Sequence, residues 1–378
     1  MDNFENTMHQ QVLSLPELLR QQYEDLEPKV RKVLTTPEIF SIQHIVLTGC
    51  GDSHAAAMAV KYTFEALTGL PTEVVPAIEL SRYYREEKLG GAPADPLVIA
   101  VSNSGSVARV GEAIQRVVKH GAFALAVTGN RGSILGTSAS RILDLAIPAF
   151  PSCPGTRSYL VSLLALHLLA IRIGEVRGRY TMDQAMAYRY DILAQADKLE
   201  EMLPEMDRQM LALASAWKDK EAFDLVGAGP DFSTAWFGQA KVYEATGRYA
   251  MSMNTEEWLH LNFFMRRVEH IGTVVVCSSD SPALSRAKEL IAHASEDMGR
   301  STLVITDGEL GIHTDAVICR TPKTAYPMSG ILTQFVPLCL LTGYIAAMIG
   351  EVDGRGCEGP WAFAQNGAGV KNSEIIVK

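Results

Sequence analysis

The chain contains 378 residues, of which 47% are hydrophobic and 20% are charged, and its formal net charge is −9. This composition is typical of a packed soluble protein and excludes the disordered and fibrous classes, while a length about two to three times that of an ordinary domain predicts two domains. Because the chain is acidic and its Lys and Arg residues form no stripe, we expect no nucleic acid partner.

The cysteines, the histidines and the first residues bear on cofactors and location. The six cysteines lack CxxC and Cys/His ligand spacing, and no HxxEH or HExxH arrangement is present, so we expect no metal and no other cofactor. Such scattered cysteines are typical of free thiols in a reducing compartment. Residues 1–10 contain acidic side chains and no apolar stretch of a signal peptide, which predicts a cytoplasmic protein.

We predict an N-terminal helical arm over residues 1–35 and a first α/β domain over residues 36–180. In that domain three apolar runs end in loops: HIVLTG at Gly49, PLVIAV before Ser102, and ALAVTGN at residues 124–130. Small and apolar residues at helical spacing follow the first loop, so the pattern is strand, glycine loop and helix. Strands that alternate with helices predict a parallel sheet covered on both faces.

Residues 181–218 predict a charged helix that joins this domain to a second copy of it over residues 219–354. The glycine loop at Gly49 recurs at Gly227, 178 residues later. We therefore predict an α/β protein with two tandem parallel-sheet αβα sandwich domains of the flavodoxin-like or Rossmann-like type. Residues 355–378 predict a Gly-rich tail over the active site, with a frayed end as the alternative.

Residues 331–349 approach the length of a transmembrane helix. They belong to the repeat, since the motif IGEV that begins at Ile349 also begins at Ile173, after the apolar run 160–170. The earlier run carries His167, which a lipid-facing helix would hold only at a high energetic cost. Both runs are therefore predicted to be core helices of a protein without a membrane partner.

Ligands of open parallel sheets bind beyond the carboxyl ends of the strands. In the first domain these positions carry Cys50–Ser53 and Ser102–Ser106, whose hydroxyls and helix N-terminal amides suit a monophosphate. A dinucleotide is disfavoured, because His54 stands where the third glycine of that fingerprint would be, and no Walker motif is present. An ordinary helix cap explains Ser102–Ser106 equally well at this point.

With these motifs in this order, the chain resembles the sugar isomerase (SIS) domain family over residues 36–378, in particular the isomerase half of glucosamine-6-phosphate synthase and its stand-alone relatives. The resemblance implies a sugar phosphate as the small-molecule substrate. The substrate-binding residues that it implies are Cys50, Gly51, Asp52, Ser53, Ser102, Asn103, Ser104, Ser106, Thr156, Ser158 and Glu257.

The resemblance also implies the catalytic groups. Lys241 and Glu244 match the family's K-x-x-E, Glu257 and His260 match its E-x-x-H, and Lys371 matches a tail lysine that closes over the sugar. In the family the histidine is contributed across a dimer interface, so the resemblance implies a homodimer with the active site at the interface.

The chemistry of an aldose/ketose interconversion fits these residue types. A carboxylate such as Glu244 moves a proton between C1 and C2 well if burial raises its pKa toward the working pH. The imidazole of His260 suits ring opening because it titrates near neutrality. From spacing alone, however, a helical Glu is more often a solvated surface residue, and a His among aromatic residues is more often a core residue.

Four positions depart from the family pattern. Asp52 puts a carboxylate beside the expected phosphate, and Val107 replaces a hydroxyl donor, so the anion pocket is altered. Arg109 could supply a compensating cation, or the substrate could lack a phosphate. Leu261 and Asn262 replace the usual Gly-Pro after the histidine.

The sequence leaves three functions open. The first is an isomerase or deaminase-like enzyme that acts on a hexose or amino-hexose phosphate with Glu244, without a glutaminase domain, since no nucleophilic cysteine follows Met1. The second is a deglycase that releases an amine from a fructosamine-type 6-phosphate, favoured by Asp52, whose carboxylate could receive an ammonium. The third is a sensor that binds sugar phosphates without turnover, which Glu244, His260 and Lys371 together disfavour.

Overall fold

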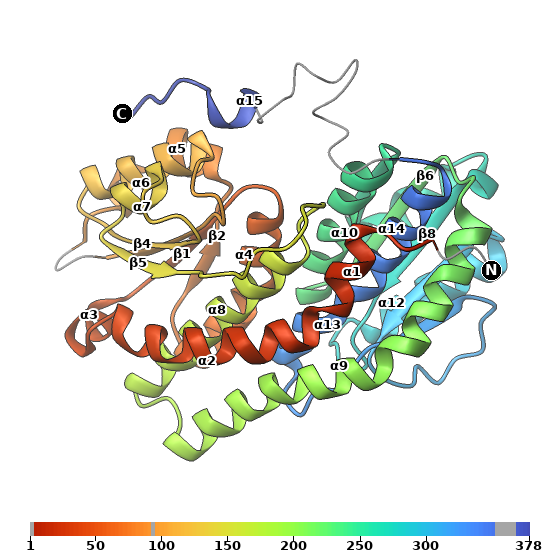
Figure 1. Cartoon of the computed structure of the whole chain (residues 1–378), viewed down its shortest axis with the longest axis horizontal. Helices are drawn as coiled ribbons and strands as arrows, with labels where there is room; N and C mark the ends of the chain where they lie inside the picture. Colours follow the sequence, from red (N-terminus) through yellow and green to blue (C-terminus); the bar gives the residue numbers. More distant parts are fainter. Residues whose placement is uncertain (1–3, 92–94, 352–367) are drawn as a thin grey trace. The chain divides into compact units, whose positions relative to one another are not determined.

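The computed structural model describes residues 4–91, 95–351 and 368–378, which form two compact units (Figure 1). The first-sheet unit comprises Leu18–Ala149, Arg157–Tyr190 and the described part of Gly356–Lys378. The second-sheet unit comprises Phe150–Thr156 and the described parts of Met1–Glu17 and Asp191–Arg355. Each predicted α/β domain contributes its sheet to one unit, whereas the predicted arm and the predicted joining helix are divided between the units.

The first-sheet unit contains a five-stranded parallel sheet with strand order β2-β1-β3-β4-β5. Its strands are β1 (Ile45–Thr48), β2 (Thr72–Val74), β3 (Leu97–Val101), β4 (Phe123–Thr128) and β5 (Arg141–Asp144). β1 and β3 are buried throughout, as expected for runs of Ile, Val and Leu without polar alternation. Its helices are α3 (Thr36–Ser41), α4 (Asp52–Thr68), α5 (Ala77–Arg82), η1 (Glu86–Lys88), α6 (Ala108–Lys119), α7 (Ile134–Ser138), α8 (Arg157–Val176) and α15 (Ala368–Lys371).

The second-sheet unit contains a five-stranded parallel sheet with strand order β10-β9-β8-β6-β7. Its strands are β6 (Ala222–Gly227), β7 (Tyr249–Asn254), β8 (Ile271–Val276), β9 (Ser301–Thr306) and β10 (Val317–Arg320). Its helices are α1 (Thr7–Leu13), α10 (Pro230–Thr246), α11 (Thr255–Leu261), η2 (Asn262–Phe264), η3 (Val268–His270), α12 (Leu284–Ala292), η4 (His293–Asp297), η5 (Pro327–Ser329), α13 (Ile331–Gln334) and α14 (Val336–Met348). Two further helices, α2 (Leu15–Val33) and α9 (Met182–Trp217), contain residues of both units.

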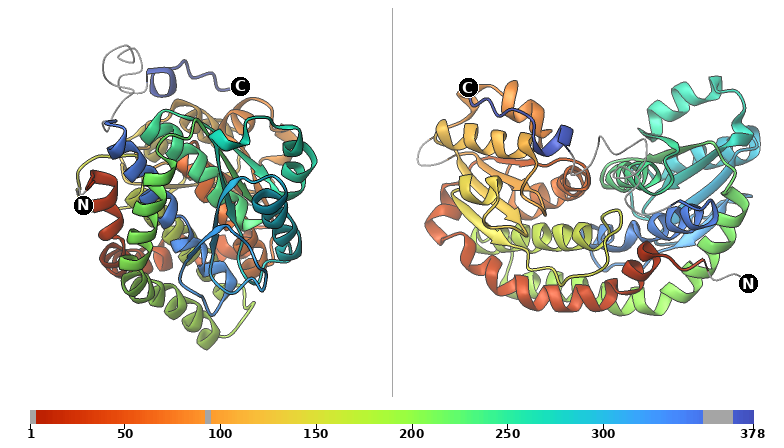
Figure 2. Two further views of the ribbon diagram at one scale, coloured as in Figure 1. Left: turned by 90° about the vertical axis from the view of Figure 1, so that its right-hand side faces the viewer. Right: turned by 45° about the horizontal axis from the view of Figure 1, so that its top comes forward.

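Helices cover both faces of each sheet (Figure 2), which confirms the predicted fold class of two tandem parallel-sheet sandwiches. In the first-sheet unit, α4 packs on α8 and α5 packs on α6. Alternate strand residues such as Val46, Val98 and Ala100 form one buried cluster with apolar residues of α5 and α6. This two-residue alternation is what a strand with both faces buried requires.

The predicted duplication extends to backbone conformation. Both α4 and α10 have 17 residues, and each follows a glycine in a left-handed conformation, Gly51 with φ 58° and Gly229 with φ 57°. Both helices also end at a left-handed glycine, Gly69 and Gly247. A residue with a Cβ adopts these angles only with strain, so the glycines fix where each helix begins and ends.

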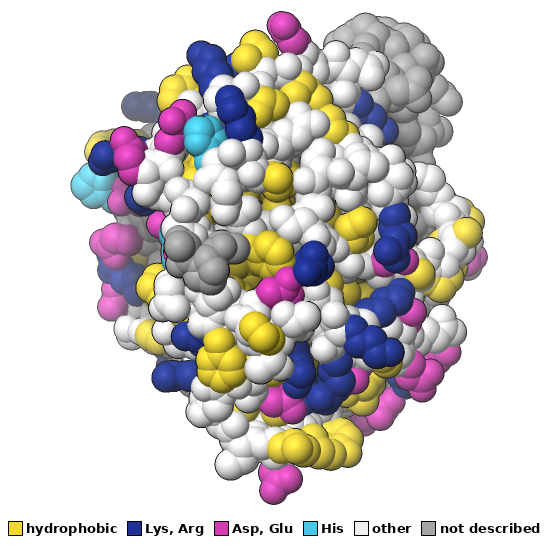
Figure 3. All heavy atoms as spheres, turned by 90° about the vertical axis from the view of Figure 1, so that its left-hand side faces the viewer, with side chains coloured by type: hydrophobic (Ala, Val, Ile, Leu, Met, Phe, Trp, Pro, Cys, Tyr) yellow, Lys and Arg dark blue, Asp and Glu magenta, His cyan; other side chains and the backbone are white. Residues whose placement is uncertain are grey.

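The two apolar runs form helices that are long and apolar enough to cross a membrane, at Arg157–Val176 and Pro327–Met348. In each helix, 83% of the most apolar 18-residue stretch is buried inside the structure, as in the core helices of soluble proteins. His167 on the first of them is buried, and its Nδ1 lies 2.7 Å from the carbonyl oxygen of Leu163. On the face shown in Figure 3, basic side chains lie among acidic ones.

Candidate functional site

The loop Ser102–Ser106, here called the serine loop, follows β3 and leads into α6. The Ser102 backbone N–H donates to the Val127 carbonyl at 3.0 Å, which continues the pairing of β3 with β4. The buried Ser102 hydroxyl accepts a hydrogen bond from the Gly105 N–H at 3.1 Å. Gly105 has φ 64°, and a Cβ there would lie 1.9 Å from the Ser133 hydroxyl oxygen. The loop therefore has one path, and that path requires glycine.

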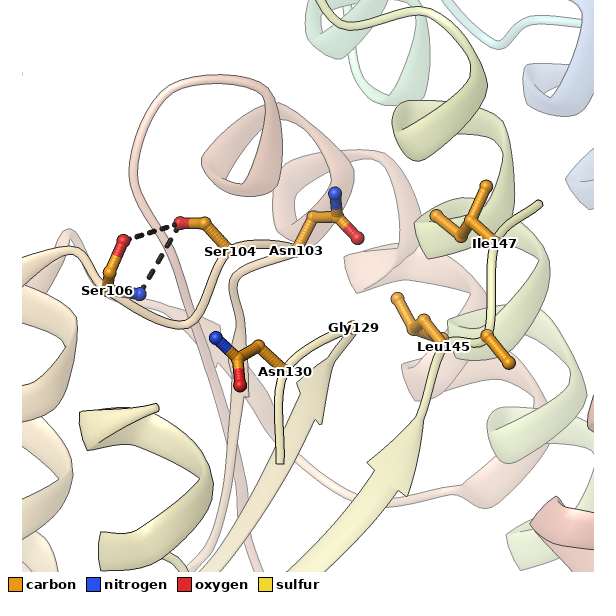
Figure 4. Close-up of a pocket in the computed structure, with 8 residues that line it drawn as sticks. Asn103, Ser104, Ser106, Gly129, Asn130, Leu145 and Ile147 are labelled. Atoms are coloured by element: carbon orange, nitrogen blue, oxygen red, sulfur yellow. Dashed lines mark hydrogen bonds between the residues drawn. The ribbon is translucent and has the colours of Figure 1, made fainter. Parts of the chain in front are cut away.

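A cavity of about 470 Å³ opens beside the serine loop (Figure 4). Polar side chains on one side face apolar residues that follow β5 on the other. The Ser106 hydroxyl donates to the Ser104 hydroxyl oxygen at 3.1 Å, so the two groups are adjacent. The lining residues are Asn103, Ser104, Ser106, Gly129, Asn130, Leu145, Ala146 and Ile147.

The N-terminus of α6 adds a second feature that suits an anion. Val107 is the N-cap residue, and its side chain makes no capping hydrogen bond to the first turn. Helix N-terminal amides carry a partial positive charge and bind anions readily. Valine at position 107, where the family has a hydroxyl residue, cannot donate a hydrogen bond to a ligand. It also cannot accept one from the amides of the first turn, so the N-cap side chain leaves these amides available.

Arg109 does not supply the compensating cation that the sequence left open. Its guanidinium pairs with the Glu112 carboxylate at 2.5 Å and donates to the Ser373 hydroxyl at 3.0 Å and to the Glu374 carbonyl. Its hydrogen bonds are therefore made with its own helix and with the C-terminal segment.

The other predicted phosphate loop, Cys50–Ser53, lies between β1 and α4. Because β1 pairs in parallel with β3, this loop reaches the same edge of the sheet as the serine loop, but the cavity described above is lined from β3, β4 and β5. Gly51 is the N-cap of α4, and Asp52 lies in its first turn. Burial raises the pKa of the Cys50 thiol, although Arg109 acts to lower it. A thiol with a raised pKa is a weak nucleophile, and Cys50 packs against the apolar cluster of the first sheet.

Thr156 and Ser158, also predicted to bind substrate, lie at the start of α8 or just before it. Thr156 is buried in the second-sheet unit, where its hydroxyl donates to the Pro154 carbonyl at 3.1 Å. Ser158 belongs to the first-sheet unit, and its carbonyl accepts from the Ser162 hydroxyl at 2.8 Å. Neither residue lines the cavity at the serine loop.

Lys241 and Glu244 lie on α10 in the second-sheet unit. Lys241 is fully buried, its Nζ lies 4.7 Å from the centre of the Phe237 ring, and it forms an ion pair with Glu244. The Glu244 side chain is 43% exposed, so burial, the condition under which a carboxylate suits this proton transfer well, is not met. Glu244 lies about one turn after Lys241 on α10. Its side chain therefore faces solvent while the buried lysine holds its carboxylate in place.

Glu257 and His260 lie on the short helix α11, and both are exposed. The Asn254 side chain caps this helix by accepting the Glu257 N–H at 2.9 Å. The alternative of a core histidine among aromatic residues is not found, because His260, Phe263 and Phe264 are all exposed. Only Trp258, on the opposite side of the helix, is fully buried.

A buried ionic network under α11 was not anticipated from the sequence. The Asp224 carboxylate on β6 accepts from Arg300 at 2.5 Å and from the Trp258 indole N–H at 3.2 Å. Arg300 also donates to the Asn262 carbonyl at 3.2 Å and lies over the Trp258 ring. These bonds attach the middle of α11, at Trp258, and its C-cap, Asn262, to the sheet, and so fix the helix that carries His260. The available signal was an aspartate inside the apolar run of β6.

The second sheet has its own counterpart of the phosphate loop, at Asp231 on α10 and Ser278 after β8. The buried Asp231 carboxylate accepts from the Ser278 N–H at 2.9 Å, from the Ser278 hydroxyl at 2.6 Å and from the Gln334 amide at 2.7 Å. Burial raises the pKa of Asp231, although these hydrogen bonds act to lower it. A side chain of the protein thus occupies the donors that a ligand anion would use.

Lys371 is exposed at the end of α15, which contacts α6 in the first-sheet unit. Of the predicted site residues, the structure therefore gathers Asn103, Ser104 and Ser106 in one cavity. Gly129, Asn130 and Leu145–Ile147 are cavity residues that the sequence reasoning missed. Among the described residues, no group of three or more His, Cys, Asp or Glu side chains could hold a metal ion.

Comparison with known proteins gives one family match. Residues 38–172 match the family described as the SIS domain. A glutamine–fructose-6-phosphate aminotransferase (isomerizing) from Gloeobacter violaceus is 25% identical over 357 residues, which is 92% of this chain and 56% of that protein. The chain spans about half the length of the curated relatives that it matches.

Solved structures share the fold. The C-terminal domain of glucosamine-fructose-6-phosphate aminotransferase from Francisella tularensis has a TM-score of 0.79 and 18% identity, covering 93% of this chain and 99% of that one. Tagatose-6-phosphate ketose/aldose isomerase from Escherichia coli has a TM-score of 0.70 and 15% identity, covering 91% of this chain and 94% of that one.

Proposed function

We propose that this chain, which carries a SIS domain over residues 38–172, is a phosphosugar isomerase acting on a hexose or amino-hexose 6-phosphate. The observation that carries the proposal is the cavity at the serine loop, which is lined by the Ser104 and Ser106 side chains just before α6, a helix whose N-cap residue makes no side-chain capping bond. The sequence relationship to the isomerizing aminotransferases supports the same reaction class.

The cavity has the properties that a sugar phosphate needs. Its volume of about 470 Å³ lies within the roughly 300 to 1,000 Å³ of small-molecule sites. Ser104, Ser106 and the first-turn amides of α6 supply neutral donors for a phosphate, which we place there. Asn103 and Asn130 offer amide groups to sugar hydroxyls, and Leu145 provides an apolar wall.

In this proposal Glu244 transfers the proton between C1 and C2, and His260 opens the ring. The match to the family's K-x-x-E and E-x-x-H supports these roles, as does the Lys241 ion pair, which holds the Glu244 carboxylate in one orientation. Lys371 would contact the sugar. A homodimer that shares active-site residues, and an intracellular location, also belong to the proposal.

Asp52 favours a second function, a deglycase that releases an amine from a fructosamine-type 6-phosphate. Its carboxylate lies in the first turn of α4, at the same sheet edge as the serine loop. A carboxylate disfavours a neighbouring phosphate but stabilises a substrate ammonium. A deglycase would use the same C1 to C2 proton transfer by Glu244.

An assay panel separates these functions. The protein is tested with fructose 6-phosphate plus ammonia, with glucosamine 6-phosphate and with fructosamine 6-phosphates. Turnover of the last alone supports the deglycase, and tight binding without turnover of any of them supports a sensor and contradicts the proposal.

The variant Glu244→Gln tests the catalytic assignment. We expect it to abolish turnover while the substrate Kd stays within about tenfold, or about 1.4 kcal/mol. Glu65→Gln is a matched control, because Glu65 forms an exposed helical ion pair with Lys61 on α4. Unchanged turnover in Glu244→Gln contradicts the assignment.

A further inference from the structure

The C-terminal segment Ser373–Lys378 lies along α6 in the first-sheet unit. Arg109, in the first turn of α6, donates to the Ser373 hydroxyl and to the Glu374 carbonyl. Farther along the helix, the Glu112 carboxylate accepts the Ile376 backbone N–H at 2.6 Å. Beyond the end of α6, His120 lies 3.2 Å from the Lys378 carbonyl oxygen. The segment thus follows α6 in the same direction, held by side chains of α6 and the residue after it.

Glu112 is the centre of this attachment. Its side chain is fully buried, and Arg82 contacts both carboxylate oxygens, at 2.5 and 3.0 Å. Arg109 contacts the same carboxylate at 2.5 Å. Burial acts to raise the pKa of Glu112, but the hydrogen bonds from Arg82 and Ile376 and the charge of Arg109 outweigh it and lower this pKa. The carboxylate is therefore ionised near neutral pH, and it accepts the Ile376 N–H as a charge-assisted hydrogen bond.

The attachment also fixes Lys371. Ser373 is the second residue after Lys371, and a chain step of two residues spans at most about 7 Å. The Arg109 to Ser373 bond of 3.0 Å therefore keeps α15 at the end of α6 that directly follows the serine loop. The contact of α15 with α6 is consistent with this placement.

We infer that Glu112 and Arg109 are positioning residues that hold the C-terminal segment on α6 and thereby place Lys371 beside the serine loop. The inference rests on the proposed function, because it concerns a lysine to which that proposal gives a role at the sugar. Arg82 binds Glu112 without involving the segment, so the carboxylate keeps a partner when the segment is released. Release of the segment therefore need not unfold the unit.

The variant Ile376→Pro tests the attachment directly. Proline lacks the backbone N–H that Glu112 accepts, and residue 376 lies outside helices and strands. We expect tryptic cleavage after the exposed Lys371 to become about tenfold faster, with an unchanged melting temperature. Val377→Pro is the matched control, because it introduces the same ring one residue later and keeps the Ile376 N–H. Equal cleavage rates in Ile376→Pro and wild type overturn the inference, and this readout needs no turnover.

Kinetics test the placement of Lys371. We expect Ile376→Pro to lower kcat by about as much as Lys371→Met, with KM within about threefold of wild type, since the serine loop is unchanged. The kcat of the double variant should be no lower than that of Lys371→Met alone, because both changes remove the same interaction of Lys371 with the sugar. Additive losses, or a wild-type kcat in Ile376→Pro beside a reduced one in Lys371→Met, overturn the inference. No effect of Lys371→Met on kcat contradicts both the role of Lys371 in the proposed function and its placement by Glu112, whereas the cleavage result still reports on the attachment alone.

Discussion

The buried ion pair of Arg300 and Asp224 under α11 should contribute strongly to the free energy of unfolding. Arg300→Met removes the guanidinium but keeps a side chain of similar length. The Arg300 side chain is fully buried and that of Asp224 is 6% exposed, so the carboxylate is left in the interior without its cation. Breaking a buried pair by removing one partner destabilises a protein by about 3 to 5 kcal/mol. We expect a loss of this size in the free energy of unfolding at pH 8.

The loss should depend on pH. Burial raises the pKa of Asp224 above its ordinary value of 3.8, although the charge of Arg300 and the hydrogen bonds from Trp258 and Arg300 act to lower it. Without Arg300 this pKa rises further. A carboxyl group with a raised pKa binds its proton more tightly in the folded chain, so the penalty is full above the folded-state pKa and disappears as the pH falls toward 3.8. Within that window each pH unit changes it by about 1.4 kcal/mol.

Urea unfolding at pH 8 and pH 5, followed by tryptophan fluorescence, measures this difference. Arg286→Met is the control, since Arg286 forms exposed pairs with Glu256 and Glu289 in the same unit, and such pairs contribute little. The reasoning is refuted if the loss in Arg300→Met is the same at both pH values, or no larger than the loss in the control.

Three further predictions concern the loops and the core. Gly105→Ala should weaken sugar phosphate binding at least about tenfold in calorimetry, because its Cβ would lie 1.9 Å from the Ser133 hydroxyl oxygen; wild-type affinity would contradict the rigid loop path. Asp231→Ala leaves the half-buried donors of Ser278 without their acceptor and should cost about 1 to 3 kcal/mol in urea unfolding, whereas Asp231→Asn should cost less. Leu164→Ala on the buried helix α8 should cost about 2 to 5 kcal/mol, and a loss below about 1 kcal/mol would show that this helix is loosely packed.

The sequence predicts those parts of the fold that repeat and that depend on local chemistry. The strands are apolar runs, and the glycine loops at Gly51 and Gly229 recur with their conformations, so the two parallel sheets follow from the pattern. The serine loop is also found from the sequence, because hydroxyl residues after a buried strand mark the edge of a parallel sheet.

The rest of the candidate site depends on contacts that are distant in the sequence. Asn130 and Leu145 join the cavity only because β4 lies next to β3 and β5 lies next to β4, an order that the sequence does not state. The pairing of Asp224 with Arg300 spans 76 residues, and no local pattern marks the two as partners. The exposure of Glu244 likewise depends on what packs against α10, and its spacing alone is typical of the solvated surface residue that is found.

The carboxylate of Asp231 gives the two related halves different responses to solutes. Being covalently attached, it stays at its donors whatever the phosphate concentration. The serine loop has no such built-in counter-ion among the described contacts of its hydroxyls, and in the proposed function the substrate phosphate takes that place. The second half thus supplies its own anion at this position, whereas the first half, in the proposed function, takes one from solution.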